Sequence, residues 1–519
     1  MTEISPERIR AHVKFLSNDL LEGRGVGARG GDLATEYIAA QLALAGAKPA
    51  GDNKTYYQNF TLIGADPQPN SLLTMTANGL STPFKWLDEF VGVTYAQIPS
   101  PAFDAEAVFV GHGITAPEFQ WDDYAGIDVR GKVVVMFTGE PPSDDPKFFG
   151  GKALTYYGRW TYKYEEATRH GAVAAIIIHT TPTASYGWDV VRSSWGREDQ
   201  QVKLAPGEPA LMLASWVTTE AGQKIALSIG KSVDDLLKMA DTRGFKAIPL
   251  GVRFRGNMPT RIREAKTRNV VGIFEGSDPV LKSEAVIFSA HWDHLGIGPA
   301  VKGDSIYNGA ADNATGCGMV LEMARAWAAL PQKPKRSAIF LLVSAEEAGL
   351  RGSNYYGEHP VIPAAKTAVA LNFDQFQPWG RTKDVVIIGA DRTTVYPVIQ
   401  EALKRFSFTL SPDPNPSAGH FYRSDHFSFA RVGIPAFSID EGEDILGKPA
   451  GTGHKLRDEF DEARYHQPSD EYSDDWDFTG MAYYARFGML IGVNTANLPK
   501  LPTWMPGDEF LAAREKSAK

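Results

Sequence analysis

The chain has 519 residues, of which 43% are hydrophobic and 22% are charged, and its formal net charge is -9. This length exceeds the roughly 250 to 300 residues at which a single core stops growing, so more than one domain is expected. The acidic balance and the lack of a clustered basic stretch exclude a nucleic-acid partner. A single cysteine, Cys317, excludes an intrachain disulfide.

Neither the longest apolar run nor the N-terminal residues predict a membrane-spanning segment or a secretory signal. The longest clearly apolar run, residues 172–178, is far shorter than the roughly 20 residues that cross a bilayer. Residues 1–6 lack a basic segment followed by an apolar one, so the sequence as given shows no secretory signal. A cytoplasmic location therefore stays open, and the sequence does not predict an oligomeric state.

The N-terminal region predicts a packing helix. Residues 31–47 place apolar side chains at helical spacing and end beside a glycine, as helices often do. Just before it, the string Gly-Val-Gly-Ala-Arg-Gly at 25–30 has the spacing of a dinucleotide-binding fingerprint. No strand precedes this string and no acidic residue follows in a βαβ context, so we predict a turn there.

The sequence pattern changes between residues 68 and 258, where short β-like runs alternate with Pro and Gly turns. Within this stretch, residues 131–137 predict a buried strand, and residues 164–178 predict a helix that leads into another strand. We therefore predict a β-rich domain at 68–258, inserted into a discontinuous domain of residues 1–67 and 259–519. The inserted segment shows no catalytic constellation.

From residue 259 onward, strands alternate with helices, which predicts an α/β fold: a mostly parallel mixed sheet sandwiched by helices. A helix is expected at residues 315–330. The expected strands are 284–290, 337–343, 367–373, 384–389 and 434–439.

Polar residues follow these strands directly, at the edge where open α/β sheets bind their ligands. Histidine and carboxylate groups arriving from different strands are the ligands that Zn²⁺ prefers. The chain has no Gly-x-Ser-x-Gly elbow and no His-Glu-x-x-His helix, so serine hydrolase and single-zinc metzincin functions lose their main support. The residues that follow strands or open the 315–330 helix are His291, Asp293, His294, Asp312, Glu346, Glu347 and Asp374.

Six strings along the chain resemble successive motifs of the M28 family of metallopeptidases, in the same order. The inserted segment resembles a protease-associated (PA) domain, which also has a Gly-Lys strand, a helix and a Gly-Ala strand. The six strings are Ser-Ala-His-Trp-Asp-His-Leu-Gly at 289–296, Tyr-Asn-Gly-Ala-Ala-Asp-Asn-Ala-Thr-Gly at 307–316, Ser-Ala-Glu-Glu-Ala-Gly-Leu-Arg-Gly-Ser at 344–353, Asn-Phe-Asp at 372–374, Arg-Ser-Asp-His at 423–426 and Tyr-His-Gln-Pro-Ser-Asp at 465–470.

This resemblance implies two zinc ions per chain. His291 and Asp374 would bind one zinc, Glu347 and His466 the other, and Asp312 would bridge both. Such paired metals lie roughly 3.5 to 4 Å apart and clamp the developing oxygens of the reaction. Many relatives have an aspartate where this chain has an alanine, just before Asp312, which alters the surroundings of the bridging ligand without removing it.

The resemblance also implies catalytic roles. Glu346 would be the general base, Asp293 would fix the tautomer of a metal-bound histidine, and Tyr465 would donate to the oxyanion. Arg423 would line the substrate cleft. His294 competes with His291 for the first ligand position.

We therefore predict a zinc exopeptidase, in particular an aminopeptidase acting on peptides with a free amino terminus. Two alternatives remain, a glutamate-type carboxypeptidase and a receptor-like or scaffold protein on the same fold. A third, ring closure by a glutaminyl cyclase, fits poorly because that chemistry uses one zinc. The resemblance implies a periplasmic or secreted location if a signal peptide was removed. Two roles remain for Asp470, which could orient His466 or cap a helix.

Overall fold

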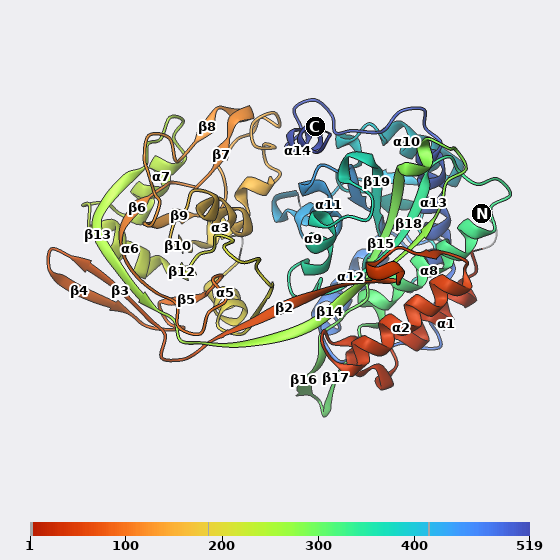
Figure 1. Cartoon of the computed structure of the whole chain (residues 1–519), viewed down its shortest axis with the longest axis horizontal. Helices are drawn as coiled ribbons and strands as arrows, with labels where there is room; N and C mark the ends of the chain where they lie inside the picture. The colour runs from red at the N-terminus through yellow and green to blue at the C-terminus, as the bar shows by residue number, and fades with distance from the viewer. Residues whose placement is uncertain (1–3, 185, 414–415, 519) are drawn as a thin grey trace. The chain divides into compact units, whose positions relative to one another are not determined.

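The computed structural model describes residues 4–184, 186–413 and 416–518, and they form two compact units (Figure 1). Unit 1 comprises Met1–Thr61, Lys266–Pro414 and His420–Lys519, and unit 2 comprises Leu62–Ala265 with Asn415–Gly419. The division falls inside two long strands, β2 (Tyr57–Pro67) and β14 (Thr260–Phe274). The boundaries predicted at 67/68 and 258/259 lie at the end of the first strand and just before the second.

The main sheet has the strand order β11-β2-β14-β18-β15-β19-β22, and it belongs to unit 1 except for β11 and the ends of β2 and β14, which belong to unit 2. Strand β15 pairs in parallel with β18 and β19, and β19 pairs in parallel with β22, whereas β14 is antiparallel to β18. The predicted α/β fold with a mixed sheet is therefore confirmed, but parallel pairing is confined to β18, β15, β19 and β22, and the pairs β11–β2, β1–β14 and β14–β18 are antiparallel. The bounds are β11 (Asp199–Val202), β15 (Ala285–His291), β18 (Ser337–Val343), β19 (Thr367–Asn372) and β22 (Ala436–Ser438), with β1 (Lys48–Pro49) beside β14.

Helices cover both faces of this sheet (Figure 1). Helices α8 (Thr315–Ala328) and α13 (Thr479–Ala496) contact each other and β15, while α9 (Arg351–Glu358) and α11 (His426–Arg431) lie on the opposite face. Helix α1 (Pro6–Leu16) and helix α2 (Arg29–Leu44) pack against α8. The helices expected at 31–47 and 315–330 are thus present, with slightly earlier ends.

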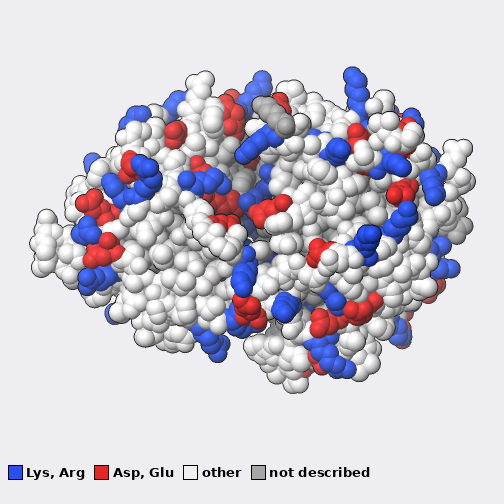
Figure 2. All heavy atoms as spheres, in the orientation of Figure 1, with Lys and Arg blue, Asp and Glu red and all other residues white. Residues whose placement is uncertain are grey.

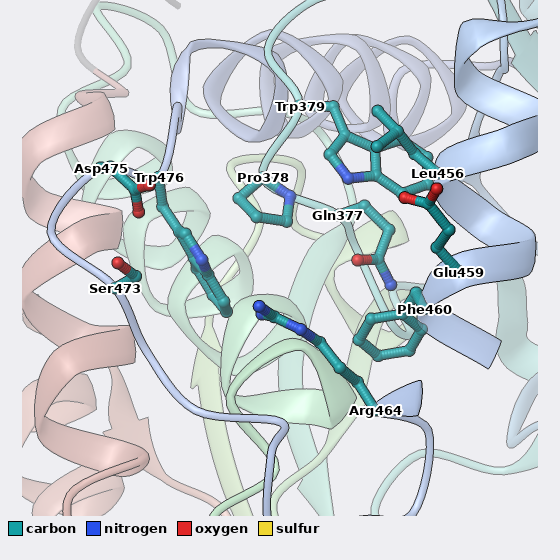
Figure 3. A pocket seen from close by; sticks show the side chains of 10 residues that line it. All are labelled: Gln377, Pro378, Trp379, Leu456, Glu459, Phe460, Arg464, Ser473, Asp475 and Trp476. Carbon is teal, nitrogen blue, oxygen red and sulfur yellow. The ribbon is translucent and has the colours of Figure 1, made fainter. Parts of the chain in front are cut away.

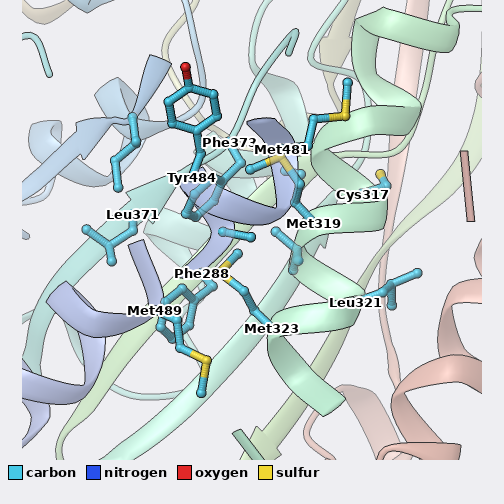
Figure 4. Close-up of a cluster of buried hydrophobic side chains, with 14 of the residues drawn as sticks. Phe288, Cys317, Met319, Leu321, Met323, Leu371, Phe373, Met481, Tyr484 and Met489 are labelled. Carbon is cyan, nitrogen blue, oxygen red and sulfur yellow. The ribbon is translucent and has the colours of Figure 1, made fainter. Parts of the chain in front are cut away.

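The central strands are buried on both faces. Every residue of β15, β18 and β19 is buried, as their continuous apolar sequence requires of parallel strands between two helical layers. Figure 4 shows Met323 of α8 and Met489 of α13 beside Phe288 of β15. At Gly492 a Cβ atom would lie 2.3 Å from the Phe288 ring, so glycine lets α13 approach the sheet closely.

One predicted strand lies outside the main sheet. Residues 384–389 were expected in it, but only β20 (Asp384–Val386) forms, in a separate three-stranded sheet with β21 (Thr409–Ser411) and β23 (Asp440–Glu441). The apolar run at 385–388 is only four residues long, and a run of this length does not specify which sheet a strand joins. The remaining helices and strands of unit 1 are α10 (Tyr396–Phe406), α12 (Thr452–Ala463), α14 (Leu511–Ser517), β16 (Gly296–Val301) and β17 (Asp304–Tyr307).

Unit 2 has its own eight-stranded sheet, in the order β4-β3-β13-β6-β9-β10-β12-β5. The strand expected at 131–137 is β9, and the helix and strand expected at 164–178 are α3 and β10, so both predictions are confirmed. The bounds are β3 (Leu72–Ala77), β4 (Leu80–Phe84), β5 (Phe90–Val93), β6 (Ala102–Phe109), β9 (Val133–Phe137), β10 (Ala174–Ile178), β12 (Leu213–Val217), β13 (Ile248–Asn257), α3 (Trp160–Arg169), α4 (Thr181–Ala184), α5 (Trp188–Trp195), α6 (Thr219–Leu227) and α7 (Val233–Ala240).

Surface charge and helix hydropathy agree with the composition. Figure 2 shows Lys and Arg side chains interspersed with Asp and Glu on the visible face, without a continuous basic patch. Among the helices of the described residues, none combines the length and the apolar character needed to cross a membrane.

Candidate metal centre

Three neighbouring strands of the unit 1 sheet end beside one another, and polar side chains that follow them lie close together. Strand β15 ends at His291, β18 leads into Glu346 and Glu347, and β19 leads into Asp374. Because these strands are parallel neighbours, their carboxyl ends meet at one edge of the sheet. The geometry brings the Nε2 atom of His291 within 3.0 Å of a carboxylate oxygen of Asp374.

Asp312 lies between two histidines. Its Oδ1 atom is 3.2 Å from Nε2 of His291, and its Oδ2 atom is 3.4 Å from Nε2 of His466. His466 is also 3.0 Å from Oε2 of Glu347. The five side chains expected to bind metal therefore come together as two groups that share one carboxylate, with His291 and Asp374 on one side and Glu347 and His466 on the other.

His294 joins the second group. Its Nδ1 atom is 2.7 Å from Oε1 of Glu347, and its buried Nε2 atom has no hydrogen-bond partner among the described residues. Ligand atoms of His294, Asp312 and Glu347 lie within 4.8 Å of one another, as do those of His291, Asp312 and Asp374. The motif at 289–296 offers His294 as an alternative to His291, whereas the structure places it beside Glu347 in the opposite group.

The charges in this site are strongly coupled. Although burial opposes it, hydrogen bonds from His291 and His466 hold the pKa of Asp312 well below its usual range. Despite its partial burial, the hydrogen bonds of His466 to Asp312 and Glu347 raise its pKa to about 10. Against the effect of burial, Asp374 and a hydrogen bond to Asp312 likewise raise the pKa of His291 well above its usual range, so two imidazolium groups partly offset the carboxylates. A divalent cation would displace these protons, because histidine binds metals in its neutral form.

Imidazole and carboxylate groups in this arrangement fit zinc chemically, since both are zinc ligands and each group offers three of them. The orphaned Nε2 atom of His294 and the orphaned Oδ2 atom of Asp293 are further signs that the polar atoms here lack partners. Buried polar atoms without partners are uncommon, so a bound cation that reorganises this network agrees with them.

Glu346 sits on the turn between β18 and α9. The preceding residue, Ala345, has a positive φ of 57°, and the backbone N–H of Glu346 donates to Oδ1 of Asp293 at 3.2 Å. Burial, followed by the carboxylates of Asp374 and Glu347, raises the pKa of Glu346 well above its ordinary value. A carboxyl group with a raised pKa is suited to accept and release protons near neutral pH.

Asp293 is fully buried, and it was expected to fix the ring of His291. The carboxylate lies 3.9 Å from Nδ1 of His291, whereas the backbone oxygen of Asp293 is 3.1 Å from the same nitrogen. The carbonyl is thus the nearer acceptor, and the carboxylate instead holds the N–H of Glu346. Burial raises the pKa of Asp293 to about 6.

The other two expected residues are more exposed. Tyr465 is 42% exposed, and its ring stacks on His466 with 3.9 Å between centroids. Partial burial, followed by the carboxylates of Asp312 and Glu347, raises the pKa of Tyr465, so its phenol keeps its proton at neutral pH. Arg423 is exposed, and its guanidinium has no hydrogen bond or ion pair within the described parts of the chain.

The sequence did not single out Ser424, which supports Asp374. Its hydroxyl donates to Oδ2 of Asp374 at 2.6 Å and accepts from Nδ2 of Asn372 at 2.8 Å. Asn372 accepts in turn from Ser289 at 2.9 Å. Ser424 lies inside the string at 423–426, so its position in that motif was the available signal.

Asp470 was open between two roles, and the structure shows a third. Its buried carboxylate accepts from the backbone N–H groups of Ala311 and Asp312, at 2.9 and 3.0 Å. It therefore holds the backbone of the loop that carries Asp312, rather than the ring of His466 or a helix end. The helix that follows, α13, begins only at Thr479.

A hollow of about 410 Å³ lies elsewhere on unit 1 (Figure 3). Two indole rings and the guanidinium of Arg464 face it in Figure 3, and Arg464 is two residues before His466. None of the residues expected in the metal centre lines it. The lining residues are Gln377, Pro378, Trp379, Leu456, Glu459, Phe460, Arg464, Ser473, Asp475 and Trp476.

Residues 269–485 match the family model described as Peptidase family M28. A stretch of 177 residues is 28% identical to leupeptin-inactivating enzyme 1 of Streptomyces exfoliatus, covering 34% of this chain and 36% of that protein. A stretch of 209 residues is 27% identical to aminopeptidase YwaD of Bacillus subtilis (strain 168), covering 39% of each. The chain thus spans well under half the length of these relatives.

Among solved structures, the chain is similar to an aminopeptidase from Aneurinibacillus sp. strain AM-1. The two share 20% identity with a TM-score of 0.51, over 98% of this chain and 97% of that one. At this identity the similarity concerns the fold, and it agrees with the α/β architecture described above.

Proposed function

We propose that this chain is a zinc-dependent aminopeptidase with a two-metal site. The observation that carries the proposal is Asp312, whose two carboxylate oxygens face two separate histidine–carboxylate groups. One group, His291 and Asp374, would hold the first zinc. The other, Glu347 and His466, would hold the second, and His294 lies close enough to Glu347 to orient it.

Bound zinc would supply Lewis-acid activation of water and of the scissile carbonyl. The chain's own groups then handle the protons. Glu346 would take up a proton from the attacking water and deliver it to the leaving amine, a task that its raised pKa favours. Tyr465 keeps its phenolic proton and would donate a hydrogen bond to the carbonyl oxygen as negative charge develops there.

The preference for an amino terminus rests on charge. Glu346, Glu347 and Asp374 are the partly exposed carboxylates of the site, so a substrate ammonium group would meet acidic neighbours. Among the described residues, the ion pairs seen for the proposed ligands are with histidines and not with lysine or arginine, so no fixed cation offsets these carboxylates. Arg423, which we retain as a substrate contact, is exposed.

The inserted unit is part of the proposal as a PA-like domain. Strand β9, helix α3 and strand β10 follow one another in the order that suggested this resemblance, and β9 and β10 are parallel neighbours. The proposal gives this unit no part in bond cleavage, because the groups of metal-ligating residues found among the described residues all belong to unit 1.

The test is the initial rate of hydrolysis of leucine p-nitroanilide, measured beside its N-acetylated counterpart, with two equivalents of zinc. Rapid cleavage of the free-amine substrate alone is expected. Cleavage of neither substrate, together with release of glutamate from peptides ending in that residue, would replace the aminopeptidase with a carboxypeptidase. Protein that retains no zinc after dialysis would favour the scaffold alternative.

A further inference from the structure

Arg24 is a buried cation that contacts the metal centre only through backbone. Its side chain is fully buried, and Nε donates to the carbonyl oxygen of Trp292 at 2.8 Å. Its Nη1 atom donates to the carbonyls of Leu16 and Asn308 at 2.7 and 2.6 Å, and Nη2 donates to that of Gly309 at 2.8 Å. Within the described chain no carboxylate lies at ion-pair distance from this guanidinium.

These carbonyls belong to the loops that carry the proposed ligands. Trp292 directly follows His291, and residues 308 and 309 lead into Asp312. A planar guanidinium can hold several carbonyls in fixed directions, which a lysine with one ammonium group cannot do. Burying a cation without a carboxylate partner is costly, so its presence here calls for a reason other than packing.

Asp470 binds the same loop by accepting hydrogen bonds from its backbone N–H groups. The backbone oxygen of Asp470 accepts from the N–H of Ala310 at 3.0 Å, and its carboxylate accepts from the N–H groups of Ala311 and Asp312. The carbonyls of Asn308 and Gly309 are held by Arg24. Each residue of the segment 308–312 therefore has a backbone group bound by one of these two buried charged residues.

The glycines around Arg24 fit this arrangement. A Cβ atom at Gly23 would lie 2.4 Å from the carbonyl oxygen of Tyr307, and one at Gly25 would lie 3.1 Å from the Cα atom of Gly296. Gly23 and Gly25, on either side of Arg24, thus let this segment approach the backbone of Tyr307 and Gly296. Only Gly25 belongs to the string at 25–30, and this close approach accounts for a glycine at that one position.

We propose that Arg24 and Asp470 are positioning residues that together fix the loop 308–312, and thereby the direction of the Asp312 carboxylate toward both metals. The inference rests on the proposed function for the identity of the metals. Neither residue would touch substrate, and both would act through Asp312.

The test uses the full-length variants Arg24→Lys and Asp470→Asn, which keep the approximate size of each side chain. Zinc dissociation constants are measured by titrating metal-free protein in zinc buffers, and thermal stability is measured in the metal-free state. Both variants are expected to bind zinc roughly 10- to 100-fold more weakly, as residues that orient metal ligands do. Amide hydrogen exchange in a peptide covering 306–316 is expected to accelerate.

Arg336→Lys is the matched control. Arg336 is also buried in unit 1, and it donates to Glu284 at 2.7 Å and to the carbonyl of Leu498, away from all proposed ligands. This variant is expected to lose thermal stability while keeping wild-type zinc affinity. If the Arg24 and Asp470 variants behave like this control, the positioning role is wrong although the proposed function stands.

Residual peptidase activity separates the remaining outcomes. At saturating zinc, a repositioned Asp312 is expected to lower kcat while KM stays near the wild-type value. Wild-type protein that binds no zinc would overturn the proposed function itself, whereas full zinc affinity and wild-type kcat in both variants would overturn only this inference. If Arg24→Lys fails to fold, Asp470→Asn alone decides the matter, because asparagine retains one acceptor for the same amides.

Discussion

Both units bury ionisable groups, but they satisfy them differently. In unit 2, Lys163 is fully buried and donates to the carbonyl of Gly139 at 2.8 Å, while the buried carboxylate of Asp123 accepts from the N–H of Ile114 and the indole of Trp121. In unit 1, five carboxylates and three histidines lie close together beyond the ends of parallel strands, and Nε2 of His294 has no hydrogen-bond partner among the residues that the structure describes.

The difference shows what distinguishes a structural cluster from a candidate metal centre. The Asp123 carboxylate has its own donors and a lysine that interacts with it electrostatically, so that cluster is complete without a ligand. The Asp312 and Glu347 carboxylates depend on shared histidines, which must carry protons to balance them. Under the proposed function a divalent cation would complete the second cluster, whereas the first is satisfied by its own residues.

Removing metal should have the largest effect and should affect only unit 1. Chelation is expected to abolish peptide hydrolysis, and added zinc should restore it. Because metal at about 1,000 times its dissociation constant stabilises a folded protein by roughly 4 kcal/mol, the melting transition of unit 1 should fall as well. Hydrogen exchange reports each unit separately, and an equal loss of protection in β9 and β15 would contradict the comparison.

The substitution Glu346→Gln should come next. It removes the proton acceptor while keeping the size and the hydrogen-bonding backbone of the residue, so kcat is expected to fall about 10²- to 10⁴-fold. Zinc content should remain at the wild-type level, as measured by elemental analysis. Glu401→Gln, at an exposed position on α10, is the matched control and should change neither quantity. Turnover within tenfold of wild type would remove Glu346 from the mechanism.

In unit 2, Lys163→Met should destabilise the fold without affecting catalysis. Burial lowers the pKa of Lys163 to about 7 and raises that of Asp123 to about 7. Removing one member leaves the other buried charge uncompensated, at a cost of about 3 to 5 kcal/mol in the free energy of unfolding. The exposed Lys152→Met serves as the control and should leave stability unchanged within about 0.5 kcal/mol.

The loss of folding stability in Lys163→Met should be larger at high pH than at low pH. The raised pKa of Asp123 means that this carboxyl group binds its proton more tightly in the folded protein than in the unfolded chain. The stabilisation that comes from this proton is therefore present at low pH and is lost as pH rises from about 4 to beyond 7. The variant should therefore be less unstable at about pH 5 than at about pH 8. Denaturant unfolding followed by hydrogen exchange in α3 measures this, and the opposite order would show that Asp123 stays ionised.

Cys317→Ala should have the smallest effect. The thiol donates to the backbone oxygen of His291 at 3.1 Å, and burial raises its pKa to about 12, so it remains protonated. Loss of this contact should cost about 1 kcal/mol of stability and leave kcat near wild type. A large loss of turnover at unchanged zinc content would give this residue a chemical role that the comparison of the two units denies it.

The sequence by itself determined the fold class and the residues that gather in the centre. Continuous apolar runs are the mark of strands buried on both faces, and His291, Glu346, Glu347 and Asp374 follow such runs directly, so their meeting at one sheet edge follows from parallel pairing. His466 lies in no strand, and only the resemblance to a family suggested it. Their roles as ligands and base remain predictions for the experiments above.

Tertiary structure alone decided how those residues are supported. The strand expected at 384–389 belongs to a separate sheet, because apolar character over a few residues does not specify which sheet a strand joins. Arg24 and Asp470 are 446 positions apart, and nothing local indicates that both bind the loop at 308–312. Local patterns determine which elements form, whereas hydrogen bonds between distant segments depend on how those elements pack, and packing is a property of the whole chain.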